Sequence, residues 1–158
     1  MEGRDAAWFD ALFRDHAAAV HRYLVRRAPR DADDLAAEVL TIAWRRRADV
    51  PEGAELPWLY RTAGFVLANH RRKKQPLTLE TLPEQDVDDD PADAVVTDEL
   101  VREALAHLSP RDRRILLLHA WEGLGGEELA VVLGISRGGA DAALSRARSR
   151  LAAAWARS

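Results

Sequence analysis

The sequence contains no cysteine, which excludes disulfide frameworks, thiolate metal sites and cysteine nucleophiles. It also lacks any apolar run near the roughly 18 residues that a membrane span requires. The longest such runs are residues 115–121, which His119 interrupts, and residues 129–135. The amino terminus has neither a basic n-region nor an apolar h-region, so we expect no signal peptide. These absences predict a soluble, cytoplasmic protein.

The sequence also shows no group of residues with the spacing of a metal site or a phosphate-binding loop. The five histidines show no metal-ligand spacing, and His16 and His21 lie on different faces of a helix because they are five residues apart. The glycine-rich stretch 123–126 has no strand before it and no lysine after it, unlike a phosphate-binding loop. We therefore expect no catalytic residue, no metal, no cofactor and no enzymatic activity.

Basic side chains are absent from one part of the chain, residues 77–101. The 158 residues carry a net charge of −3. Residues 1–76 hold 14 basic and 11 acidic side chains, residues 77–101 hold 9 acidic and no basic ones, and residues 102–158 hold 9 basic and 6 acidic ones. Two mildly basic blocks are thus separated by a strongly acidic stretch, an asymmetry that the total conceals. Arginine outnumbers lysine by 21 to 2, and codon bias explains most of that excess.

Period-2 alternation is nearly absent, while apolar residues recur at helical spacing throughout. The pattern predicts an all-α protein. Its expected helices cover residues 8–24, 31–47, 57–74, 96–108, 110–121, 127–133 and 137–155, with a loop at 48–57.

Several local details follow from this pattern. The second helix is expected to start near Asp31 or Asp33, whose carboxylates can cap or complement the exposed amides at its amino terminus. Ser109 is expected to cap the fifth, with Asp112 as the reciprocal member of a capping box. Phe13 and Phe65 fall on apolar faces, and either Ala43 or Trp44 should point inward.

Residues 77–95 combine crowded acidic groups with prolines, which predicts a flexible linker. We therefore expect two small helical domains, residues 1–76 and 96–158, joined by this acidic linker. The acidic side chains either form a solvated tether or mimic a nucleic-acid strand. They could also mask basic faces of the free protein, in which case neutralising Asp86, Asp88, Asp89 and Asp90 would raise DNA binding without polymerase.

A short helix, a Gly134-Ile135-Ser136 turn and an arginine-bearing helix form a helix-turn-helix pattern. Gly134 suits a positive φ at the turn, and Ser136 can cap the second helix. The alternative is an ordinary helical hairpin. Arginines 146, 148 and 150 do not share one face, so some of them must be solvated or pair with acids.

A basic cluster at residues 71–74 ends the third predicted helix. It either binds phosphates or is a solvated helix terminus that complements the helix dipole. Trp58, Tyr60 and Phe65 precede it, and aromatics beside cations suit unpaired bases, although Trp58 and Phe65 also fit a core.

Several sequence segments, in the same order along the chain, resemble those of the extracytoplasmic-function (ECF) sigma factors. Residues 33–45 resemble their region 2.2, and residues 56–63 resemble the start of their region 2.3–2.4 helix. Residues 105–113 resemble the opening of region 4, which residues 122–148 continue. The resemblance covers roughly residues 8 to 152.

This resemblance implies a promoter-specificity subunit of bacterial RNA polymerase. The second helix would dock on the clamp helices of the β′ subunit through Asp34, Leu35, Glu38, Val39, Ile42, Trp44, Arg45 and Arg46. The third would bind and help to open the −10 element through Trp58, Tyr60, Arg61, Phe65, Asn69, Arg71, Arg72, Lys73 and Lys74. The last would enter the major groove at the −35 element through Ser136, Arg137, Gly138, Arg146 and Arg148.

The family also implies contact with the β flap, a linker that threads toward the active-site cleft, and an anti-sigma factor. Two positions depart from the family pattern on the last predicted helix, which would be the DNA-recognition helix. Asp141 replaces a usual lysine and Ala143 replaces a usual arginine. Gly64 and Phe65 likewise replace a usual Arg-Asn pair. Two alternative functions therefore stay open: a stand-alone helix-turn-helix regulator, and a polymerase-binding protein without promoter specificity.

Overall fold

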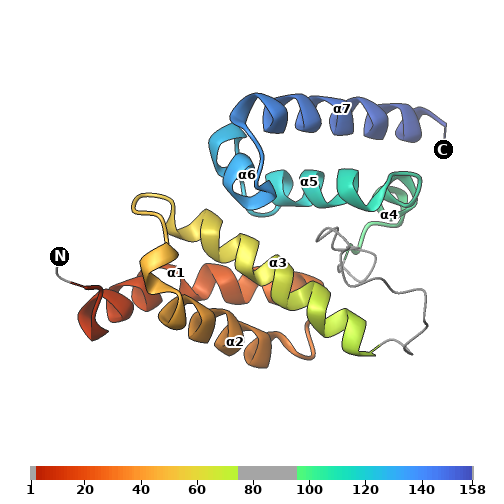
Figure 1. Cartoon of the computed structure of the whole chain (residues 1–158). Coiled ribbons are helices and arrows are strands. Elements are labelled where there is room, and N and C mark those ends of the chain that lie inside the picture. Colours follow the sequence, from red (N-terminus) through yellow and green to blue (C-terminus); the bar gives the residue numbers. More distant parts are fainter. Residues whose placement is uncertain (1–2, 75–95, 158) are drawn as a thin grey trace. The chain divides into compact units, whose positions relative to one another are not determined.

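The computed structural model describes residues 3–74 and 96–157, and its regular structure there is helical (Figure 1). The chain divides into two compact units, residues 1–77 and 78–158. The predicted acidic linker, residues 77–95, lies wholly outside the described residues. None of the described helices is long and apolar enough to cross a lipid bilayer.

The first unit is a three-helix bundle of α1 (Ala6–Arg27), α2 (Ala32–Arg45) and α3 (Glu55–Lys74), with a short 3₁₀ helix η1 (Arg47–Asp49) between the last two. The three helices pack against one another (Figure 1). Each contributes apolar side chains at helical spacing, so one stripe per helix is removed from water. The buried core includes Leu12, Val20, Leu24, Leu35, Val39, Ala43, Leu59, Ala63 and Leu67.

Aspartates at the start of α2 bind its neighbours instead of capping it. Asp31 occupies the N-cap position but its side chain makes no capping hydrogen bond, so the capping alternative was wrong for Asp31. Asp33 lies in the first turn, where a negative charge complements the amino end of the helix. Its carboxylate lies 3.0 Å from His70 Nε2 of α3, and the Asp33 carboxylate lies 2.7 Å from His21 Nε2 of α1. The amino end of α2 is thereby connected to both other helices.

Two phenylalanines expected on apolar faces are exposed. Phe13 follows the buried Leu12, and one residue turns a helix by 100°, so Phe13 faces outward. Phe65 lies outward on α3 for the same reason, beside the buried Val66. Ala43, not Trp44, points inward. The loop expected at 48–57 is shorter, because α3 begins at Glu55 with Pro57 in its first turn.

The second unit contains α4 (Glu99–Ala106), α5 (Pro110–Ala120), α6 (Gly126–Leu133) and α7 (Arg137–Ala156). Helix α7 packs against the other three. Small alanines on α7 allow this close approach, and its buried residues include Ala140, Ala143, Ala147 and Ala154.

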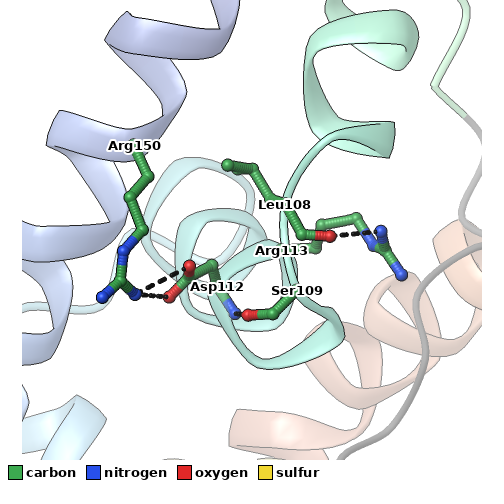
Figure 2. Close-up of polar contacts among 5 residues, drawn as sticks. All are labelled: Leu108, Ser109, Asp112, Arg113 and Arg150. Atoms are coloured by element: carbon green, nitrogen blue, oxygen red, sulfur yellow. Dashed lines mark hydrogen bonds and ion pairs between the residues drawn. The ribbon is translucent and has the colours of Figure 1, made fainter.

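The start of α5 is connected to two other helices (Figure 2). Ser109 Oγ accepts a hydrogen bond from the Asp112 backbone N–H at 3.1 Å, as predicted. Asp112 does not complete a capping box; its carboxylate instead accepts from Arg150 Nη1 of α7 at 3.0 and 3.1 Å. Arg113 donates to the Leu108 carbonyl at 2.7 Å, which joins α5 to the segment after α4.

Candidate nucleic-acid and protein interfaces

The turn between α6 and α7 has the geometry predicted for a helix-turn-helix. Helix α6 ends at Leu133, and Gly134 adopts the left-handed conformation with φ of 68°. Ser136 Oγ then accepts a hydrogen bond from the Gly139 N–H at 3.0 Å and caps α7. A glycine is required at the turn because other residues rarely adopt this φ. The amino end of α7 is thus fixed by local chemistry.

The predicted DNA-contacting residues of α7 are all on the surface. These residues are Ser136, Arg137, Gly138, Arg146 and Arg148. Ala143 is only 5% exposed and belongs to the core. We expected that replacing the family's usual arginine by Ala143 removes a cation from the DNA-facing surface. That expectation was wrong, because this position faces the other helices. Of the two departures from the family pattern, only Asp141 alters the exposed face.

Charged groups surround the start of α7. Arg137 Nη1 lies 2.8 Å from the Glu127 carboxylate of α6, and Arg137 Nε lies 3.9 Å from Asp141 Oδ2. Asp141 also approaches the start of α6 so closely that a Cβ at Gly126 would overlap its carboxylate. Sequence reasoning did not find these contacts, since they join two helices.

Helix α3 carries a stripe of aromatic, basic and amide side chains, of which Arg61, Phe65 and Arg72 are exposed and Trp58 and Asn69 half-buried. Trp58, Arg61, Phe65, Asn69 and Arg72 recur at steps of three or four and share one face. Phe65 is 45% exposed, and the Arg61 guanidinium lies 5.7 Å from the centre of its ring. This combination offers a flat apolar surface next to a positive charge.

Other predicted residues of α3 are placed differently. Tyr60 is only 4% exposed and packs against Tyr23, with ring centres 5.4 Å apart, so it is a core residue. Arg71 is half-buried and donates to the Arg27 carbonyl at 3.3 Å. Arg72 and Lys73 are exposed, and the side chain of Lys74 lies outside the described residues.

Helix α2 exposes a mixed charged and aromatic surface. Asp34, Glu38, Trp44, Arg45 and Arg46 are exposed, and Ile42 is half-buried. Leu35 and Val39 are 3% and 0% exposed; they pack in the core and have no surface to offer a partner. This corrects their assignment to a contact surface.

An apolar groove of about 450 Å³ runs between α1 and α2. Trp44 packs edge-on against Phe9, with ring centres 5.6 Å apart, and Arg47 covers the Trp44 ring at 4.1 Å. Sequence analysis missed the contribution of α1, because it placed Phe13 in the core. The lining residues of the groove include Phe9, Phe13, Ala37, Leu40, Thr41 and Trp44.

A second apolar groove, of about 510 Å³, lies in the second unit. The exposed Trp155 of α7 lies at this groove, which no sequence pattern had indicated. It is lined by residues of α4, α5 and α7, including Val101, Leu105, Leu116, Leu151 and Trp155.

Both units match models of the sigma-70 class of transcription factors. Residues 12–76 match "Sigma-70 region 2", and residues 98–151 match "Sigma-70, region 4". The chain is 35% identical over 160 residues to the ECF RNA polymerase sigma factor SigF of Caulobacter vibrioides, covering 96% of this chain and 87% of that protein. The chain belongs to the ECF sigma factors.

Two further comparisons agree with this membership. The chain is 29% identical over 154 residues to the ECF RNA polymerase sigma factor SigE of Mycolicibacterium smegmatis; the match covers 90% of this chain but spans 60% of that relative's length. The sigma factor RpoE of Bartonella quintana, solved in complex with the anti-sigma factor NepR, has a similar fold with a TM-score of 0.61. That match covers 92% of this chain and 95% of the other at 19% identity.

Proposed function

We propose that this chain is a promoter-specificity subunit of bacterial RNA polymerase, which recruits core polymerase and promotes melting of the −10 element. The observation that carries the proposal is the pairing of two separate surfaces in the order of regions 2 and 4: the aromatic and basic stripe of α3, and the helix-turn-helix of α6 and α7. The chain would act in the cytoplasm as a binding subunit without catalytic chemistry of its own. Residues 1–76, 77–95 and 96–158 would be the polymerase and −10 domain, the linker and the −35 domain.

The groove between α1 and α2 supports docking on the β′ clamp helices. An apolar groove bordered by charged side chains suits a helix that lays its apolar face into it. Trp44 lies at this groove, Asp34, Glu38 and Arg45 lie on the same helix, and Arg46 follows its last residue. The groove of the second unit would accept the β flap in the same manner, and an anti-sigma factor would compete for either surface.

The stripe on α3 supports binding to an unpaired strand. Bases splayed from a duplex stack on aromatic side chains, and the neighbouring cations bind the backbone. Phe65 provides the stacking surface, while Arg61 and Arg72 provide the charge on the same face. The departure from the family pattern at Phe65 therefore still yields a surface suited to melted DNA.

One observation favours a second candidate, a polymerase-binding protein without promoter specificity. From Gly138 to Ala143 the recognition helix has no side chain longer than aspartate, so fewer groups can reach base edges. This candidate keeps the surface of α2 and loses the reading of duplex DNA.

The test uses the purified full chain with core polymerase and a genomic promoter library. We expect a stable complex and open complexes at promoters that share a −10 and a −35 sequence. The double variant R45A/R46A should weaken polymerase binding, and R22A, an exposed arginine of α1 away from the groove, is the matched control. Binding without initiation would favour the second candidate. DNA binding without polymerase affinity would instead indicate a stand-alone regulator.

A further inference from the structure

The guanidinium of Arg137 is held between carboxylates from both helices of the helix-turn-helix. The Glu127 carboxylate of α6 accepts a hydrogen bond from Arg137 Nη1 at 2.8 Å. The Asp141 carboxylate, one turn further along α7, lies 3.9 Å from Arg137 Nε. All three side chains are exposed and lie at the amino end of the recognition helix α7 or on the neighbouring α6. Exposed pairs of this kind contribute little stability, so we expect their effect in where the guanidinium lies.

One of the two acids lies at the start of α6. The Asp141 carboxylate occupies the space that a Cβ at position 126 would fill, and the glycine there leaves that space open. The amino end of a helix also favours a nearby negative charge. Asp141 is thus placed beside both Arg137 and the start of α6.

Arg137 is the one long side chain at the start of the recognition helix. Every other residue from Ser136 to Ala143 is aspartate or smaller. Recognition helices contact base edges with their amino-terminal residues, and arginine reads guanine O6 and N7 with two donors. Direct readout at this end of the helix thus depends on a single guanidinium.

We propose that Glu127 and Asp141 position Arg137 to read one guanine in the major groove, an inference that rests on the proposed function. Glu127 occupies one hydrogen of Nη1, and Asp141 lies on the Nε side. The second hydrogen of Nη1 and one hydrogen of Nη2 are left as a pair of donors. A guanidinium already held in place loses less conformational freedom when it binds the base.

The test measures base preference across the promoter. Holoenzyme containing the full chain transcribes a library whose −35 segment is randomised, and the transcripts are sequenced. Wild type should prefer guanine at one position by about 5- to 100-fold, the discrimination of a bidentate contact. R137A should abolish that preference and leave the other positions unchanged. E127Q and D141N should each reduce it several-fold. E128Q, which removes an exposed charge from the same helical turn, should leave the preference intact.

A purely electrostatic role would give a different result. If E127Q and E128Q raised initiation equally on all sequences without changing base preference, the positioning role would be wrong. A guanine preference that survives R137A would also overturn it. The same library is selected by duplex binding to the chain without polymerase, so base reading is tested even if no promoter is transcribed. Failure of wild type to initiate anywhere would contradict the proposed function alone.

Discussion

Asp112 is 6% exposed, and its carboxylate is paired with a guanidinium from a helix 38 residues further along the chain. Hydrogen bonds to charged groups contribute about 1.5–3 kcal/mol, and a buried carboxylate without a partner is destabilising. We expect D112A and R150A each to lower the free energy of unfolding by about 1–3 kcal/mol. Urea denaturation measures both. The double variant should show a coupling energy of at least 0.5 kcal/mol, because the two side chains contact each other. Strict additivity would mean that the pair adds nothing.

The proposed role of Phe65 lies in DNA melting and not in polymerase binding. Loss of a base-stacking aromatic costs about 1–3 kcal/mol per base, so F65A should lower open-complex formation by roughly 5- to 100-fold. Its polymerase affinity should stay unchanged, because the groove lies between α1 and α2. Permanganate reactivity of unpaired thymines reports melting, and V25A, an exposed apolar residue of α1, is the control. Equal melting by F65A and V25A would remove Phe65 from the proposed interface.

Individual residue roles were predictable where the chemistry is local. Ser109, Gly134 and Ser136 act within their own turns, and their sequence neighbours suffice to identify them. Asp31, Asp112 and Tyr60 were misassigned because their partners, His70, Arg150 and Tyr23, lie on other helices. A single sequence holds no information on such pairings.

Glycines of the helix-turn-helix are expected to respond differently to alanine. A Cβ at Gly138 meets nothing within 4 Å, so G138A should raise the free energy of unfolding by about 0.5–1 kcal/mol through helix propensity. A Cβ at Gly126 overlaps Asp141, so G126A should lower it. Thermal or urea unfolding measures both changes. G138A, where a Cβ meets nothing, also serves as the control for G126A. A neutral G126A would show that the Asp141 carboxylate moves aside without cost.

Helices were the most predictable level of this structure. Apolar spacing located all seven α-helices of the described residues, because each buries one stripe against its neighbours. At the edges of those stripes it was harder to predict which side chains are buried, as Phe13, Trp44 and Phe65 show. The two apolar grooves were missed for the same reason: each is formed by side chains of different helices.

At the scale of the whole molecule, each unit has its own core and should fold alone. We expect fragments 1–77 and 78–158 to show helical circular dichroism, and their spectra should sum to that of the full chain. The full chain should show both unfolding transitions of the fragments. An unfolded fragment would mean that the units depend on each other.

The contact between Gly126 and Asp141 has a consequence for how promoter specificity could be exchanged among relatives. A larger side chain at either position displaces the other, so the two positions should change together over evolutionary time. A recognition helix grafted from a relative would then need that relative's α6 with it. Under the proposed function, a −35 preference would therefore be transferred with α6 and α7 together and not with α7 alone.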